Sequence, residues 1–510
     1  MTRDLVIGVD CSTTAVKAVV WDMCGRSMAA ARAPLTLSTP RQGMGEQHPA
    51  DWSRATVSAL EAACRGVDPA RIAALAIAHQ RETFAYVDEK GEAVRPAMLW
   101  LDTRATKEIA AYGDARVHEL TGKPPNTATS WYKLIWLKNH EPQALERTRW
   151  VVDVQAYLVH RLTGRWRTSY GSVDPLGLLD LRRFTLDEGL LAEAGLAAGQ
   201  IPEMQESGEI LGELQPDIAA AVGLTPGLPV VAGLGDGQAA GLGAGITSPG
   251  TAYLNLGTGI VSGSFSAEYR WGREFRTMIG AIPKTYMPET FIGGGTFNVS
   301  WFIDRFFQLP AQSLGLDLSP EQLLETAAAN IPCGADGLLA LPYLSGALSP
   351  HWDSNARGLF LGLSERHGKA HLYRALLEGL AMEQRLATAA AEAAMGGSIK
   401  RLRVMGGGSR SALWCQIVAD VMKRRVEVSR ETETTCLGAG MLAAVGAGLF
   451  PSAVEAAAAM SGVGRVFEPM EPARSCYDSL YEVYRELYPR LRDTFARLQD
   501  FVQKEPGALK

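Results

Sequence analysis

The chain has 510 residues, with 50 lysines and arginines, 55 aspartates and glutamates, and a formal net charge of −5. A chain of this length is too long for one hydrophobic core, so we expect two or three domains. No long run carries charges of one sign, which argues against a nucleic-acid partner and against a polybasic membrane patch.

Targeting and redox signals point to the cytoplasm. The first residues pass directly into a strand pattern, so no signal peptide is expected, and no apolar segment is long enough to cross a bilayer. The seven cysteines are scattered without a CxxC pair, and the eight histidines are dispersed. We therefore expect a cytoplasmic protein with no membrane partner and no transition-metal site.

The N-terminal region predicts a three-stranded meander. Strand patterns cover Leu5–Asp10 (LVIGVD) and Ala15–Trp21 (AVKAVVW), and a third strand is expected around Ser27–Ala33. The polar turn Cys11–Thr14 joins the first two strands, and a second turn leads to the third.

The first of these turns carries groups that could bind phosphate. Backbone N–H groups of a tight turn attract anions, Thr13 and Thr14 add hydroxyls, and Lys17 adds a positive charge. Asp10 could hold Mg²⁺, directly or through water. The alternative is an ordinary Ser/Thr-rich hairpin turn, and without other evidence this alternative is favoured.

A buried strand is predicted over Ile72–Ala78, and polar residues follow it directly. Arg81 and Glu82 would then lie at a strand end, where arginine donors and glutamate acceptors can bind adjacent hydroxyls. The alternative for this pair is a surface salt bridge, which contributes little.

A carboxylate is predicted at a strand-to-helix junction in Val230–Gly245 (VVAGLGDGQAAGLGAG). Asp236 stands between two glycines, which let another molecule approach the backbone. The helix that follows has almost no large side chains, so another element can pack or slide against it. We interpret Asp236 as the catalytic base of a phosphotransferase, and a helix N-cap is the alternative.

The strand–turn–strand pattern recurs in the second half. Strands are predicted over Thr251–Leu256 and Ile260–Phe265, and the turn Gly257–Gly259 between them carries the hydroxyl of Thr258. Two such hairpins suggest an internally duplicated fold that closes on a nucleotide from both sides.

A glycine-rich junction follows further along. A strand over Leu402–Met405 runs into Gly406–Ser409, and a helix is expected from about Ala412. The backbone of such a junction can lie flush against a flat or anionic ligand. The sequence has no GxxxxGK[ST] motif, and the loose GxGxxA match at Gly235 lacks the acidic residue of a dinucleotide fingerprint.

Five separated motifs occur in a recognisable order. They are Trp100–Arg104 (WLDTR), Lys133–His140 (KLIWLKNH), the Asp236 stretch, Gly358–Glu378 (GLFLGLSERHGKAHLYRALLE) and Gly406–Ser409. Together they resemble the FGGY carbohydrate kinases, which are similar in fold to hexokinase, actin and the heat-shock chaperone ATPases. The fourth motif is the most specific, and the resemblance runs from about residue 4 to about residue 485.

The resemblance implies an α/β protein with two ribonuclease-H-like domains and a cleft between them. Residues 1–246 would form the N-terminal sugar-binding domain and residues 247–485 the C-terminal nucleotide-binding domain, with a helix and tail over 486–510. Apolar spacing predicts a surface helix over Tyr477–Phe501, and the tail 504–510 is expected to fray.

The resemblance also implies roles for single residues, with ATP and Mg²⁺ as cofactors. Asp236 would accept the proton of the attacking hydroxyl and Asp10 would orient Mg²⁺. The implied substrate contacts are Gln80, Arg81, Glu82, Trp100, Asp102 and Asp236. The implied nucleotide contacts are Thr13, Thr14, Lys17, Gly257, Thr258, Gly407, Gly408 and Ser411. Ser12 replaces a usual glycine, which leaves the geometry of that turn open.

The features that bear on the substrate disagree. Arg81 and Glu82 resemble the loop of polyol kinases, where xylulokinases more often have Met-His. Ala128 stands where glycerol kinases typically have a tyrosine that contacts substrate, and Leu341–Gly346 looks like the xylulokinase branch. The preferred substrate is D-xylulose, giving D-xylulose 5-phosphate; a polyol such as glycerol or erythritol, or another pentulose, is the alternative.

Two further hypotheses stay open at this point. A catalytically inactive sugar-sensing protein would share the fold, although the presence of both Asp10 and Asp236 speaks against it. The other hypothesis is that the chain forms a homodimer. Among the eleven tryptophans, Trp100, Trp131 and Trp352 are candidates for sugar stacking, but most tryptophans lie in cores.

Overall fold

The computed structural model describes residues 3–307 and 319–504, and its first large β-sheet lies in the N-terminal half. Three meander strands run antiparallel, and two later strands lie parallel to β1 and to each other. In spatial order the six strands are β13 (Ile210–Glu213), β14 (Pro229–Val231), β5 (Ile72–His79), β1 (Leu5–Cys11), β2 (Ala15–Asp22) and β3 (Ser27–Pro34).

The second large sheet lies in the C-terminal half. Here β15 is antiparallel to β16 and parallel to β21, which in turn is parallel to β22. In spatial order its seven strands are β17 (Arg276–Ile279), β18 (Tyr286–Ile292), β16 (Ile260–Ser264), β15 (Thr251–Leu256), β21 (Arg401–Met405), β22 (Arg425–Ser429) and β23 (Val463–Phe467).

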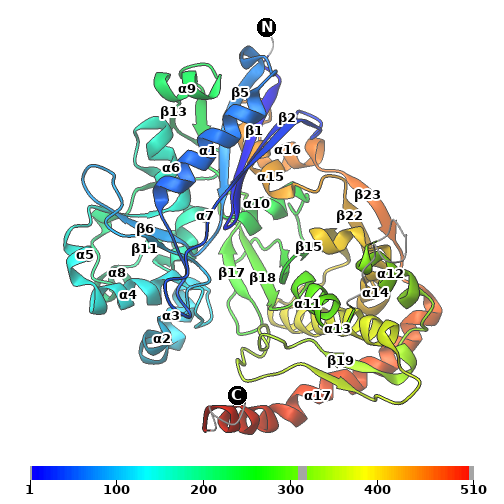
Figure 1. Ribbon diagram of the computed structural model, residues 1–510. Helices are drawn as coiled ribbons and strands as arrows, with labels where there is room; N and C mark the ends of the chain where they lie inside the picture. The colour runs from blue at the N-terminus through cyan, green and yellow to red at the C-terminus, as the bar shows by residue number, and fades with distance from the viewer. Residues whose placement is uncertain (1–2, 308–318, 505–510) are drawn as a thin grey trace.

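The two sheets repeat one pattern. The order β3-β2-β1-β5-β14 in the first matches β18-β16-β15-β21-β22 in the second, with the same strand directions. The two halves lie side by side, with α10 and α15 between them (Figure 1). The duplicated α/β fold expected from the sequence is confirmed.

Helices and smaller strands complete each half. The N-terminal half has α1 (Pro49–Cys64), α2 (Thr106–Tyr112), α3 (Ala115–Thr121), α4 (Ser130–His140), α5 (Pro142–Glu146), α6 (Val154–Thr163), α7 (Tyr170–Val173), α8 (Glu188–Glu193), α9 (Pro216–Val222) and α10 (Asp236–Gly243). The C-terminal half has α11 (Thr296–Phe306), α12 (Pro320–Ala329), α13 (Lys369–Met395), α14 (Ala412–Met422), α15 (Thr434–Gly446), α16 (Ala453–Met460) and α17 (Glu471–Lys504).

A four-stranded sheet has the order β4 (Glu46–Gln47), β7 (Ala97–Met98), β6 (Phe84–Val87) and β8 (Trp150–Asp153). Three ribbons pair β9 (Arg167–Ser169) with β12 (Glu203–Gln205), β10 (Leu179–Asp180) with β11 (Thr185–Leu186), and β19 (Leu339–Leu341) with β20 (Leu359–Leu361).

Helices α10 and α15 cross through glycines at the centre of the molecule. A Cβ atom on Gly243 would overlap the carbonyl oxygen of Thr434, and one on Gly438 would overlap that of Ala239. The small side chains expected after Asp236 therefore serve a helix–helix contact. Helix α15 also packs on the first sheet, although it follows the second sheet in sequence.

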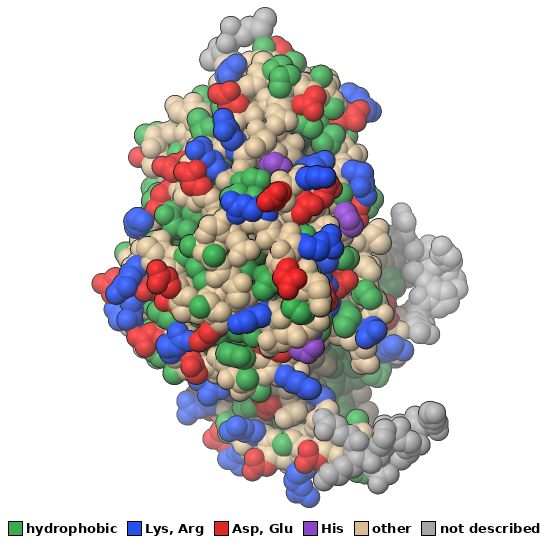
Figure 2. Space-filling view, turned by 90° about the vertical axis from the view of Figure 1, so that its left-hand side faces the viewer, with side chains coloured by type: hydrophobic (Ala, Val, Ile, Leu, Met, Phe, Trp, Pro, Cys, Tyr) green, Lys and Arg blue, Asp and Glu red, His purple; other side chains and the backbone are tan. Residues whose placement is uncertain are grey.

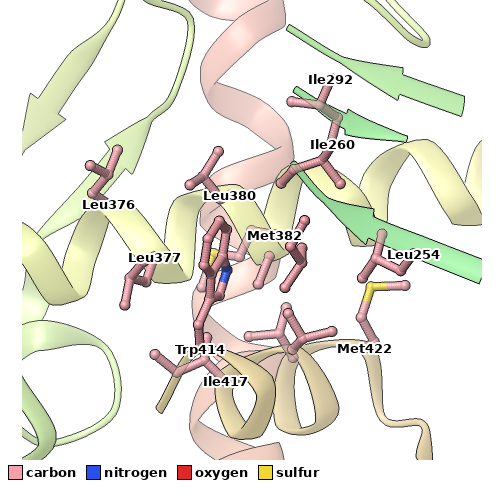
Figure 3. Close-up of a cluster of buried hydrophobic side chains, with 14 of the residues drawn as sticks. Leu254, Ile260, Ile292, Leu376, Leu377, Leu380, Met382, Trp414, Ile417 and Met422 are labelled. Atoms are coloured by element: carbon pink, nitrogen blue, oxygen red, sulfur yellow. The ribbon is translucent and has the colours of Figure 1, made fainter. Parts of the chain in front are cut away.

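The core of the C-terminal half lies between the second sheet and α13, α14 and α17. Figure 3 shows leucines and Met382 of α13 meeting Trp414 and Ile417 of α14, with Leu254 and Ile260 of the sheet close by. Because α17 contributes buried tyrosines, it is part of this core. It begins at Glu471, so the predicted boundary at residue 485 falls inside one helix, and residues 505–510 of the tail lie outside the described chain.

The surface carries mixed charges. On the face seen in Figure 2, lysines and arginines alternate with acidic side chains. None of the helices described is both long and apolar enough to cross a membrane.

Candidate active site

Three parallel strands of the first sheet end at the same edge. Their register aligns Asp10 with Ala78 and places His79 beside Gly235, so the residues that follow each strand gather there. This edge brings Asp10, Arg81 and Asp236 together, at the carboxyl ends where α/β sheets bind ligands.

Asp236 is the first residue of α10, and Gly235 is its N-cap. The carboxylate accepts a hydrogen bond from Gly237 N at 2.8 Å and lies 2.9 Å from Nε of Arg81. Its side chain is 41 % exposed, whereas that of Arg81 is 7 % exposed. The N-cap alternative is therefore wrong, and Asp236 presents a partly open carboxylate beside a buried guanidinium.

The glycines around Asp236 make room for Arg81. A Cβ on Gly235 would overlap Cγ of Arg81, and one on Gly237 would lie 2.8 Å from Oε1 of Glu289. The close neighbour expected from this glycine pattern is thus a side chain of the protein itself.

Arg81 and Glu82 are adjacent in sequence but do not pair with each other. Nη1 of Arg81 lies 2.7 Å from Glu289, and Oε1 of Glu82 lies 2.8 Å from Nη1 of Arg276. Both residues are buried, so the surface salt bridge considered for them is wrong. Burial opposes the charge on Glu289, but Arg81 and Arg276 outweigh it and hold its pKa at about 2.

Lys133, from the second sequence motif, supports the backbone of this loop. Its Nζ donates to the carbonyl oxygens of Glu82 at 3.2 Å and Leu99 at 2.8 Å. Glu82 has a φ of 51°, a conformation that side-chain-bearing residues rarely adopt. Burial lowers the pKa of Lys133 to about 7.

Predicted nucleotide and sugar residues meet in one hydrogen-bond network. The hydroxyl of Thr13 donates to Oε1 of Gln80 at 3.0 Å and accepts from Nε1 of Trp100 at 2.9 Å. Trp100 is 38 % exposed. Asp102 lies apart from this network, because its fully buried carboxylate binds Gly45 N and Arg104.

Asp10 is a buried carboxylate with a free acceptor. Among residues 3–307 and 319–504, nothing donates a hydrogen bond to its Oδ1. Burial, with smaller effects of Asp236 and Glu433, raises the pKa of Asp10 to about 7, against the opposing charge of Lys17.

Hydrogen bonds within the protein hold the rest of the N-terminal turn. Ser12 closes it through hydrogen bonds to Ala15 O and needs no left-handed backbone, so glycine is not required there. Thr14 is exposed. Lys17 is not free for phosphate, since its Nζ lies 2.6 Å from Glu433 at the start of α15.

The second sheet offers a matching edge. Its hairpin turn, Gly257–Gly259, exposes Thr258 and lies against the start of α11, where Thr296 N donates to Gly257 O at 2.7 Å. Gly407 and Gly408 follow β21 in a short 3₁₀ helix, Gly407–Arg410. Ser411 caps α14 through Trp414 N at 3.0 Å and donates to Glu325 at 2.7 Å, so this hydroxyl is already engaged.

Three other sequence candidates lie in other surroundings. Trp131 is fully buried and donates to Leu190 O at 2.9 Å. Trp352 donates to Arg273 O and lines a cavity of about 520 Å³ beside α17. Ala128 has only a methyl side chain, so it cannot hydrogen-bond a sugar, and its backbone N donates to Oδ1 of Asn126 at 2.8 Å. Sequence reasoning missed Arg276, Glu289 and Tyr253, although a lone glutamate in the apolar strand YMPETFI was a signal.

Comparison with known proteins identifies the class to which this fold and site belong. Residues 5–243 match the N-terminal domain, and residues 252–447 the C-terminal domain, of the FGGY family of carbohydrate kinases. The chain therefore belongs to this family and is a phosphotransferase.

Individual relatives differ in their substrates. A xylulose kinase of Bacillus subtilis is 29% identical over 501 residues, covering 97% of this chain and 99% of the relative. A glycerol kinase of Symbiobacterium thermophilum is also 29% identical, over 96% of this chain and 99% of the relative. The crystal structure of xylulose kinase from Rhodospirillum rubrum is 28% identical, with a TM-score of 0.88 over 96% of this chain and 100% of that one.

Proposed function

We propose that this kinase transfers the γ-phosphoryl group of ATP to a hydroxyl of D-xylulose, giving D-xylulose 5-phosphate and ADP. The observation that carries the proposal is the open carboxylate of Asp236 held beside Arg81 at the common end of three strands. The similarity to xylulose kinases along nearly the whole chain supports the choice of acceptor.

In this proposal Asp236 accepts the proton of the attacking hydroxyl, and the oxygen bonds to the γ-phosphorus as ADP leaves. Arg81, Glu82, Gln80 and Trp100 contact the acceptor and orient it. Asp102 acts through Arg104 and the backbone, because its carboxylate is already engaged.

The nucleotide would lie between the two hairpin turns. Thr14 and Thr258 contact the phosphates from opposite sides. Thr13 and Gly257 add further phosphate contacts, and Lys17 adds its charge once it leaves Glu433. Gly407, Gly408 and the backbone at Ser411 line the adenosine site. The family implies Mg²⁺, and the buried, unpartnered Oδ1 of Asp10 fits a hard cation. Mg²⁺ would supply charge neutralisation of the phosphates.

A polyol is the second candidate acceptor. The Arg81–Glu82 sequence in place of Met-His favours it, and so does the similarity to a glycerol kinase. A coupled assay of ADP release with pentuloses, hexuloses and polyols tests both. We expect the highest kcat/KM with D-xylulose; preference for glycerol or erythritol would overturn that assignment. Absence of acceptor-dependent turnover would favour a sugar-binding protein.

A further inference from the structure

Arg81 and Glu82 are held by two residues from the other half of the chain. Arg276 on β17 and Glu289 on β18 are direct partners in the antiparallel register of the second sheet. Both are buried, and Glu289 has no exposed side-chain surface. Their hydrogen bonds span 194 residues to Glu82 and 208 residues to Arg81.

These contacts form an alternating series of charges, which we term the ion-pair chain: Asp236, Arg81, Glu289, Arg276 and Glu82. Oε2 of Glu289 accepts from Nη1 of Arg81 at 2.7 Å and from Nε of Arg276 at 3.0 Å. Nη1 of Arg276 donates to Oε1 of Glu82 at 2.8 Å. Because guanidinium groups are planar and the hydrogen bonds are charge-assisted, the chain restricts the direction of each side chain.

Tyr253 completes the partners of Glu289. Its hydroxyl donates to Oε1 of Glu289 at 2.5 Å, so both carboxylate oxygens are engaged. Tyr253 lies on β15, so three strands of the second sheet converge on one carboxylate. This carboxylate accepts three hydrogen bonds from the protein and has no exposed surface, so its contacts are those of a support.

On Arg81 and Glu82, the ion-pair chain leaves a donor nitrogen and an acceptor oxygen unused. Within the described residues, no hydrogen bond engages Nη2 of Arg81 or Oε2 of Glu82. A donor and an acceptor on side chains whose other atoms are fixed can select one pattern of hydroxyls. Freely rotating side chains would adapt to several patterns instead.

We propose that Glu289 and Arg276 are positioning residues that set acceptor specificity through Arg81 and Glu82. This inference rests on the proposed function, because it requires those two residues to contact the carbohydrate. The C-terminal half would then complete the sugar site, in contrast to the assignment of sugar binding to residues 1–246 alone.

Two variants test the positioning role, Glu289→Gln and Arg276→Lys. Glutamine lacks the charge that holds two arginines, and lysine cannot span Glu289 and Glu82 in a fixed fork. We expect KM for the wild type's best acceptor to rise about tenfold or more, while KM for ATP changes less than about twofold. The ratio of kcat/KM between the two best acceptors should change about fivefold or more.

A matched pair of controls separates positioning from stability. Arg374→Lys and Glu378→Gln alter a buried Arg–Glu pair of similar build, with Arg374 Nε 2.8 Å and Tyr477 OH 2.7 Å from Glu378. The test variants and the control variants should all lower Tm, but only the test variants should change the ratio of kcat/KM between the two best acceptors.

The outcomes separate this inference from the proposed function. If Glu289→Gln does not fold, Arg276→Lys, which keeps the charge, decides the test. Unchanged acceptor KM and ratios in a folded Arg276→Lys, or equal changes in the controls, overturn the positioning role and leave the kinase assignment intact. Preference of the wild type for a polyol overturns the D-xylulose assignment only, and absence of turnover with every acceptor overturns both.

Discussion

A Cβ atom on Gly237 would lie 2.6 Å from Nη2 of Arg81, so the guanidinium fills the space that any larger residue at this position would need. The start of α10 and the loop after β5 are therefore fitted to each other. Gly237→Ala should displace Arg81 and lower kcat/KM on the order of 10- to 100-fold.

Gly237→Ala should also lower Tm, because displacing Arg81 disturbs its buried pair with Glu289, and the roughly 1 kcal/mol by which alanine favours a helix offsets only part of that cost. Steady-state kinetics and thermal unfolding check both expectations. Gly199→Ala is the control, since a Cβ there meets nothing within 4 Å. Equal kinetics for the two variants would contradict the fit between Gly237 and Arg81.

Asp236→Asn keeps the size of the side chain but removes its ability to accept a proton. Turnover should fall by roughly 10²–10⁴, the usual contribution of a general base. Binding of Mg-ATP, measured by calorimetry, should persist. Near-normal turnover would remove Asp236 from the mechanism.

The double exchange Arg81→Met with Glu82→His gives the loop of typical xylulokinases. Loss of polyol activity with gain of ketose activity would identify a polyol as the native acceptor, whereas uniform weakening would agree with D-xylulose. Since the exchange removes one charged partner from Glu289 and one from Arg276, Tm should also fall by several degrees, as breaking a buried pair costs about 3–5 kcal/mol. Unchanged ratios of kcat/KM among D-xylulose, D-ribulose, L-ribulose, glycerol and erythritol would exclude the loop from specificity.

Substrate should draw the two halves together, as in other two-domain kinases. Small-angle scattering with sugar and a non-hydrolysable nucleotide should give a smaller radius of gyration than the protein alone. The hinge is predicted near α10 and the following Thr247–Gly250. Identical profiles at demonstrated saturation would count against closure.

Glu383 gives a pH dependence that is independent of catalysis. Burial raises its pKa to about 7, although hydrogen bonds from Tyr484 at 2.6 Å and Tyr343 at 2.8 Å oppose the shift. The folded pKa exceeds the unfolded one, so the contribution to stability is complete below about pH 4.5 and is lost as the pH rises through 7.

Glu383→Gln stays neutral and should lose this dependence. Relative to the variant, the wild type's free energy of unfolding should fall by about 3 kcal/mol between pH 4 and pH 8. Urea denaturation at several pH values measures the difference. A constant difference across this range would show that folding does not raise the pKa of Glu383.

Local patterns were sufficient to predict both hairpins, the strand before Arg81 and the junction at Asp236, because each depends on neighbours in sequence. The partners of Arg81 and Glu82 could not be predicted, since Arg276 and Glu289 follow them by about 200 residues and only the packing of the two sheets brings them together. For the same reason the engagement of Lys17 by Glu433 was missed.

Helix α15 follows the second sheet in sequence but covers one face of the first, where it packs over Val6, Trp21 and Ala76. Residues 1–246 expressed alone would leave this apolar face open to water, and residues 247–504 would carry α15 without its support. Each half expressed alone is therefore expected to be less stable, and more prone to aggregate through this face, than the whole chain.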